Sequence, residues 1–113
     1  MPRGLAPRFF TKTKFDAQMM RMKTFDTMGQ ILVTLDKGLN SKSINGYNPV
    51  MEARKIYPLI PEKDGQIIDA WGKPISIAIQ PTENGFQIHI ISAGPDKKMG
   101  TADDIIKDEF LRN

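Results

Sequence analysis

The stretch ISIAIQPTENGFQIHII, residues 75–91, has the clearest strand pattern in this 113-residue chain. On both sides of PTENG, large apolar residues alternate with smaller or polar ones, which is the pattern of strands that bury one face. Asn84 and Gly85 tolerate positive φ, so PTENG is typical of a turn. The sequence therefore predicts an antiparallel hairpin over residues 75–91, whose isoleucine-rich face has to be covered by another element.

A long helix upstream is the element that we expect to cover this face. Between residues 11 and 39, apolar residues recur at spacings of three and four, the period of one helix face. They are Phe15, Met19, Met22, Phe25, Met28, Leu32, Leu35 and Leu39. The predicted helix is about 40 Å long at 1.5 Å per residue, so we expect its N-terminal half to project beyond the core. We interpret the methionines of this stripe as core packing rather than as a binding groove.

The ends of this helix have candidate capping residues. Thr11 or Thr13 is suited to the N-cap. Gly38 and Asn40 are suited to the C-terminal end. Residues 1–10 contain two prolines and a glycine, so we interpret them as a flexible leader or a remnant of cloning.

The middle and the end of the chain have weaker patterns. We expect an irregular segment over residues 40–74, with one or two helical turns in VMEARKIYPLI stopped by Pro58 and with apolar anchors at Ile67, Ile68 and Trp71. A loop over residues 92–105 and a tail over residues 106–113 follow the hairpin. The predicted fold is α+β, a single domain over residues 11–113 with a long N-terminal helix packed on a small antiparallel sheet.

Composition narrows the possible functions. The chain has no cysteine and one histidine, His89, so thiolate chemistry and multi-histidine metal sites are excluded. We interpret His89 as an exposed strand residue, since no motif supplies a partner for a catalytic base. Residues 1–23 hold six Lys/Arg and one Asp, a net +5, but no aromatic RNA-binding motif accompanies them, so we expect no nucleic-acid partner. No run of apolar residues is long enough to span a membrane.

The loop SAGPDKKMGTADDI, residues 92–105, concentrates three carboxylates: Asp96, Asp103 and Asp104. Carboxylates that converge repel one another, so a cation would stabilise them, and irregular all-oxygen donors favour calcium over magnesium. The loop is not an EF-hand, because Lys98 and Gly100 occupy its third and fifth positions. An equally weighted alternative is turn chemistry, with Asp96 in an Asx-turn and Asp103 or Asp104 capping a short helix. A carboxylate-based hydrolase has less support, since no substrate-orienting group is close in sequence.

Two motifs in order, DAWGKP at residues 69–74 and the aspartate loop, resemble those of the major pseudopilin of bacterial type II secretion systems, a member of the type IV pilin-like superfamily. The resemblance covers residues 11–105. It implies a calcium site in which Asp96, Asp103 and Asp104 supply side-chain oxygens. It also implies that Ala93 and Lys98 supply backbone carbonyls. Within DAWGKP, it implies that Trp71, with Gly72 and Pro74, forms a structural anchor.

The resemblance also implies a function and a location. The chain is expected to be a non-enzymatic structural subunit of a pseudopilus, on the periplasmic side of the bacterial inner membrane. Its expected partners are other pseudopilin subunits and other components of the secretion system. The full-length protein would carry a membrane helix with a methylated N-terminus, so we interpret this chain as the soluble domain cut from that helix. The alternatives are a protein-binding adaptor that uses the methionine-bearing helix and another pilin-like filament subunit.

Overall fold

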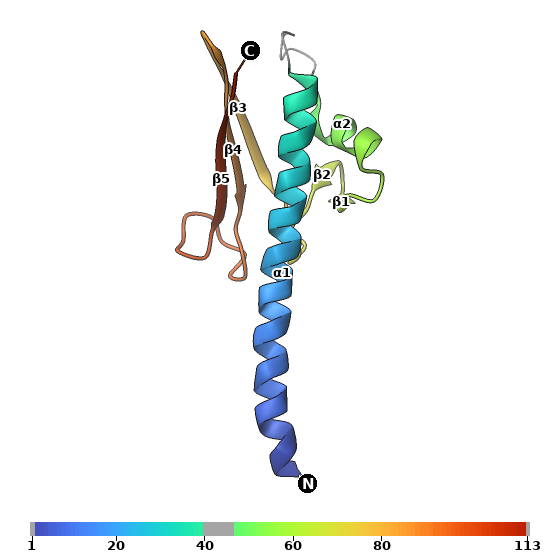
Figure 1. Cartoon of the computed structure of the whole chain (residues 1–113), viewed down its shortest axis with the longest axis vertical. Helices are drawn as coiled ribbons and strands as arrows, with labels where there is room; N and C mark the ends of the chain where they lie inside the picture. The colour runs from blue at the N-terminus through green and yellow to red at the C-terminus, as the bar shows by residue number, and fades with distance from the viewer. Residues whose placement is uncertain (1, 40–46, 113) are drawn as a thin grey trace.

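The computed structural model describes residues 2–39 and 47–112, with side-chain positions from Asp16 onwards. Its elements are α1 (Pro2–Gly38), α2 (Pro49–Ile56), β1 (Glu62–Lys63), β2 (Gln66–Ile67), β3 (Ser76–Thr82), β4 (Gly85–Ser92) and β5 (Ile105–Arg112). Strands β3, β4 and β5 form an antiparallel sheet in that order, and β1 pairs with β2. The sheet lies on one side of α1, and α2 with the β1–β2 hairpin lies on the other (Figure 1). The predicted α+β class and the hairpin over residues 75–91 are confirmed.

Helix α1 is longer than its hydrophobic pattern predicts. It begins at Pro2, so residues 2–10 continue the helix instead of forming an irregular leader, and neither Thr11 nor Thr13 is an N-cap. Proline is accommodated at the start of a helix because the first backbone N–H groups have no intrahelical acceptor. The N-terminal half extends beyond the sheet, as expected, and gives the molecule a longest dimension of 63 Å (Figure 1). The helix ends at Gly38, as expected, whereas Asn40 lies outside the described residues.

The C-terminal half of α1 covers the isoleucine-rich face of the sheet. Buried apolar side chains from α1, α2, the middle segment and the sheet form one cluster. Its members are Met28, Ile31, Leu35, Leu39, Ala53, Ile60, Ile67, Ile75, Phe86, Ile88 and Ile90. Each fully buried isoleucine contributes on the order of 1.5–3 kcal/mol relative to an exposed one. This packing, in which the long helix covers the hairpin, was predicted from the sequence.

The predicted stripe is only partly buried. Met28, Leu35 and Leu39 lie in the core, but Met22 is 64% exposed and Phe25 51% exposed. The expected role of Met22 in core packing is therefore wrong. The buried positions that replace them are Thr24, Thr27, Ile31 and Thr34. A helix has 3.6 residues per turn, so residues spaced by three drift away from the face that packs on the body. In addition, the projecting half of α1 has no sheet beside it to bury its apolar side chains (Figure 1).

The C-terminal segment is a strand, not a tail or a helix. Residues of β5 pair with β4 from Ile105 opposite Ser92 to Leu111 opposite Phe86 and Arg112 opposite Gly85. At Gly85 a Cβ would collide with the carbonyl oxygen of Leu111, so this glycine permits the close approach of β5. The strand was not predicted because its apolar residues do not alternate regularly. Its formation depends on pairing with β4, which the local sequence does not reveal.

The segment between α1 and the sheet has more structure than predicted. Helix α2 confirms the expected helical turns, and the Asn48 side chain caps it by accepting hydrogen bonds from the N–H groups of Val50 and Met51. The β1–β2 hairpin was not predicted, although its turn residues Asp64 and Gly65 both have positive φ, as a type I′ hairpin turn requires. The dipeptide Asp64-Gly65 is the sequence feature that could have predicted this hairpin. The part of the expected irregular segment at residues 40–46 lies outside the described residues.

Candidate functional site

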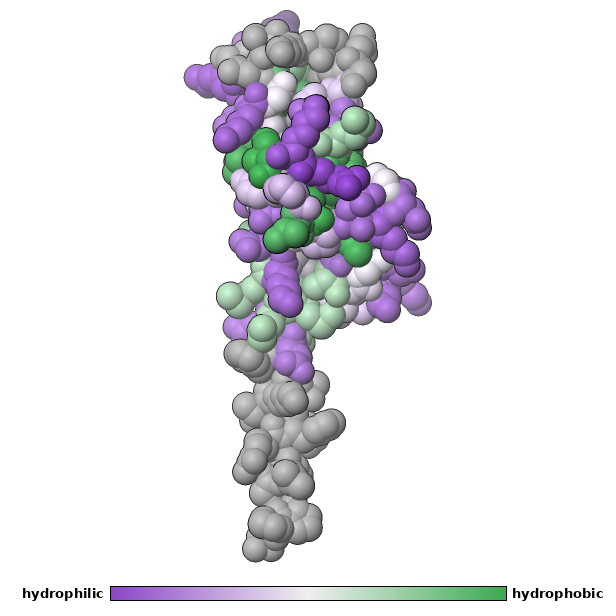
Figure 2. Space-filling view, turned by 90° about the vertical axis from the view of Figure 1, so that its right-hand side faces the viewer, coloured by the Kyte–Doolittle hydropathy of each residue, from purple (hydrophilic) through white to green (hydrophobic). Residues whose placement is uncertain are grey.

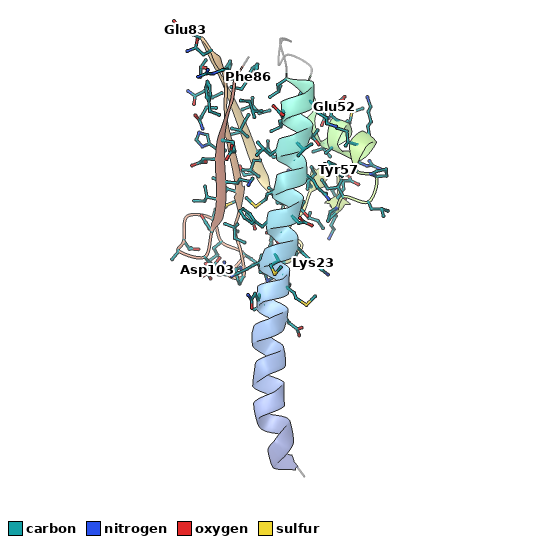
Figure 3. The ribbon with its side chains drawn as sticks, viewed as in Figure 1. Lys23, Glu52, Tyr57, Glu83, Phe86 and Asp103 are labelled. Carbon is teal, nitrogen blue, oxygen red and sulfur yellow. The ribbon has the colours of Figure 1, made fainter. Side chains whose placement is uncertain are left out.

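The aspartate loop joins β4 to β5 at the end of the sheet nearest the projecting half of α1, where Asp103 is labelled (Figure 3). One turn is closed by Lys97 N–H bonding to the Gly94 carbonyl, with N and O 3.1 Å apart. A second is closed by Asp104 N–H bonding to the Thr101 carbonyl at 3.2 Å. Gly94 has φ +78°, and a Cβ on it would collide with the carbonyl oxygen of Asp103. The beginning and the end of the loop are therefore in direct backbone contact.

The aspartate side chains bond to the backbone of their own loop. Oδ1 of Asp96 accepts from Lys98 N–H at 3.0 Å, which confirms the predicted Asx-turn. Oδ2 of Asp104 accepts from Gly100 N–H at 2.8 Å. The alternative in which Asp103 or Asp104 caps a helix is wrong, because β5 follows instead.

Thr101 lies beside the carboxylate of Asp104. Its Oγ1 is 3.5 Å from Oδ1 of Asp104. The Thr101 hydroxyl, and then the N–H of Lys98, hold the pKa of the exposed Asp96 carboxyl below its ordinary value, because both donate to the charged form. Thr101 therefore favours the ionised form of Asp96.

The predicted calcium ligands do not all converge. Within residues 16–39 and 47–112, no three His, Cys, Asp or Glu side chains are grouped closely enough to hold a metal ion. Ala93 is buried at the start of the loop, while Lys98 is exposed and its carbonyl accepts from Thr101 Oγ1 at 3.2 Å. The donors are carboxylates and carbonyls, so their chemistry fits calcium. Gathering them requires a rearrangement of exposed loop residues.

A buried carboxylate, Asp69, supports this loop from the DAWGKP turn. Asp69 is 3% exposed, and its Oδ1 accepts from the N–H groups of Trp71 and Lys73 at 2.9 and 3.0 Å. Its Oδ2 accepts from the Ser92 hydroxyl at 2.7 Å. Oγ of Ser92 in turn accepts from Gly94 N–H at 3.2 Å. Asp69 is thereby connected to the first residues of the aspartate loop.

The same turn is tied to α1. The N–H of Ala70 donates to Oγ1 of the buried Thr24 at 3.0 Å. Of the residues that the resemblance assigns as an anchor, Trp71 is half-buried, while Gly72 and Pro74 are exposed. Asp69 was not predicted as a site residue. The sequence feature that could have indicated its role is an aspartate at the start of a turn, because such a side chain can accept hydrogen bonds from backbone N–H groups a few residues later.

An apolar groove lies between α1 and the start of β5. It has a volume of about 400 Å³ and is lined by Arg21, Met22, Phe25, Asp104, Ile105 and Ile106. The Nζ of Lys107 lies 4.6 Å from the centre of the Phe25 ring, a cation–π geometry. The methionine-bearing face of α1 is therefore a partly open surface beside the aspartate loop.

A second apolar surface lies on the side of the molecule that carries α2. Figure 2 shows hydrophobic residues there among hydrophilic ones. Exposed apolar side chains of α2 and the turn after it are Met51, Ile56 and Leu59. Both sides of the body thus present apolar contact area.

His89 lies on the outer face of the sheet, as predicted. Its Nδ1 is 2.7 Å from Oδ1 of Asp108, the residue opposite it on β5, and both side chains are substantially exposed. The pair is a cross-strand contact.

Comparison with protein families, with curated proteins and with solved structures finds no significant match to this chain. Among the described residues, no helix is both long enough and apolar enough to cross a membrane.

Proposed function

We propose that this chain is the globular domain of a pseudopilin, a non-enzymatic subunit of a pseudopilus in type II secretion. In this proposal the domain lies on the periplasmic side of the inner membrane. Its partners are further copies of the subunit and other secretion-system components. The apolar surfaces beside Met22 and around Leu59 are the areas available for contacts with them.

One observation carries the proposal: the hydrogen bond from Ser92 Oγ to Asp69 Oδ2. It joins the two sequence motifs on which the resemblance to pseudopilins rests. The motifs are separated along the chain, yet they form one buried polar unit against α1. The long helix, the antiparallel sheet and this unit support the proposal.

Calcium is part of the proposal. Asp96, Asp103 and Asp104 would supply carboxylate oxygens, and Ala93 and Lys98 backbone carbonyls. The bound ion would supply positive charge that offsets the repulsion among the carboxylates and holds the exposed loop in one shape.

Thermal unfolding with calcium and with chelator tests the proposal. At a calcium concentration a hundred times the dissociation constant, the folded state gains ~2.7 kcal/mol by mass action. Asp103→Ala should abolish this gain, whereas Asp36→Ala, at an exposed position of α1, should retain it. Identical melting of the wild-type protein in calcium and chelator would remove calcium from the proposal.

A second candidate, a protein-binding adaptor, is favoured by the exposed Met22 and Phe25 in the groove. Such an adaptor would hold an amphipathic partner helix in the groove. Titration with amphipathic helical peptides tests this: Met22→Lys should abolish binding, and Met51→Lys on α2 should not. Equal binding by both variants would exclude the groove.

A further inference from the structure

We propose that Asp69 is the positioning residue of the aspartate loop and thereby sets its affinity for calcium; this inference rests on the calcium proposal above. Asp69 is not itself in the loop. It acts through Ser92 and Gly94, which lie on either side of Ala93.

The first step is the fixed orientation of the Asp69 carboxylate. Oδ1 is held by the N–H groups of Trp71 and Lys73, and the Asp69 N–H donates to the Lys73 carbonyl at 2.8 Å. The tight turn therefore occupies one oxygen and directs the other, Oδ2, to Ser92. Because the group is almost fully buried, water does not compete for these bonds.

The second step is the control of Ala93. Ser92 is fully buried at the end of β4, and its hydroxyl donates to Asp69 while accepting from Gly94 N–H. The two residues that flank Ala93 are thus held by one hydroxyl whose direction Asp69 fixes. Ala93, itself buried, is a proposed carbonyl donor to calcium.

The third step connects Gly94 to the carboxylates. Its carbonyl accepts from Lys97 N–H and so closes the turn that contains Asp96. Its α-carbon lies against the Asp103 carbonyl, where no Cβ would fit. A displacement of Gly94 would therefore move the Asp96 turn and Asp103 together.

The test compares the wild-type protein with Asp69→Asn and, as a control, Asp108→Asn on the exposed outer face. Asparagine keeps the size of the side chain but exchanges one acceptor oxygen for a donor NH₂, which cannot accept from Ser92 or from the turn. Calcium affinity is measured by calorimetry. Hydrogen exchange in chelator is measured at the amides of Lys97 and Gly100, with Ile88 and Ile90 of the core strand as internal references.

We expect Asp69→Asn to weaken calcium binding by about 10- to 100-fold, the range for residues that orient metal ligands. Exchange should accelerate at Lys97 and Gly100 but not at Ile88 and Ile90. Unchanged affinity, or acceleration spread equally over the sheet, would overturn the inference. If wild-type protein binds no calcium, the calcium part of the proposed function fails, while the exchange measurement still tests the positioning role. If Asp69→Asn does not fold, Ser92→Ala replaces it in the test, because this variant leaves the Asp69 turn intact. The expected and the contradicting results are the same.

Discussion

The hydroxyl of Ser92 donates a hydrogen bond to the buried carboxylate of Asp69, with 2.7 Å between Oγ and Oδ2, although the residues are 23 positions apart. Both residues are buried, and Asp69 receives two further bonds from its own turn. The aspartate loop therefore begins at a fixed point of the core.

Removing the Ser92 hydroxyl should destabilise the fold. Ser92→Ala leaves Oδ2 of Asp69 and the N–H of Gly94 without their partner, and an unsatisfied buried polar group costs roughly 1–3 kcal/mol. Urea denaturation measures the difference. Ser76→Ala, at an exposed position of β3, should change the free energy of unfolding little; equal losses in the two variants would refute the role of the buried bond.

Alanine substitutions at two glycines of the loop distinguish the cost of backbone strain from the cost of a steric clash. Gly94 and Gly100 have φ of +78° and +83°, so alanine at either position is strained by roughly 1–2 kcal/mol. Only at Gly94 would the new Cβ collide, with the Asp103 carbonyl, whereas nothing lies within 4 Å at Gly100. Gly94→Ala should therefore lower the free energy of unfolding more than Gly100→Ala does, and a reversed order would contradict the contact.

The connection between the turn and α1 can be tested with two threonines one helical turn apart. Thr24→Val removes the acceptor of Ala70 N–H and should cost roughly 1–3 kcal/mol. Thr27→Val is the matched control, because the Thr27 hydroxyl donates to the Lys23 carbonyl of its own helix. Chemical denaturation should show the larger loss for Thr24→Val. A larger loss for Thr27→Val would show that the Ala70 bond does not stabilise the fold.

The ionisation of Asp96 should depend on Thr101. Because the pKa of Asp96 is lowered in the folded state, its contribution to stability is present above the ordinary pKa of ~3.9 and is lost as the pH falls through the lowered value. Thr101→Val should raise this pKa towards the ordinary one. An NMR titration of the Asp96 carboxyl carbon measures it; identical midpoints in both proteins would exclude the Thr101 bond.

The sequence predicts the elements that have a regular pattern of apolar residues along their own length. The alternation of Ile77 and Ile79 and of Ile88 and Ile90 predicts the hairpin, and the three-and-four spacing predicts the covering helix. It does not show that Met22 is exposed, because that depends on where the sheet ends beside α1. Strand β5 depends on its pairing with β4 and has no comparable pattern of its own.

In the candidate site, too, contacts between neighbouring residues were predictable from the sequence, whereas contacts between distant residues were not. The Asx-turn of Asp96 follows from residue types within three positions of one another. The support of the loop by Asp69 depends on a contact with Ser92 that only the folded chain creates. The resemblance implies that Trp71 is the anchor, whereas two N–H groups of that turn donate to the buried Asp69.

We propose that calcium orders the aspartate loop of a pseudopilin-like subunit. Isothermal calorimetry of wild-type protein with calcium, and separately with magnesium, tests this proposal. We expect one calcium site per chain, weaker binding of magnesium, and loss of the site in Asp103→Ala but not in Asp36→Ala. Absence of binding heat at millimolar calcium, or the same isotherm for Asp103→Ala as for the wild type, would contradict it.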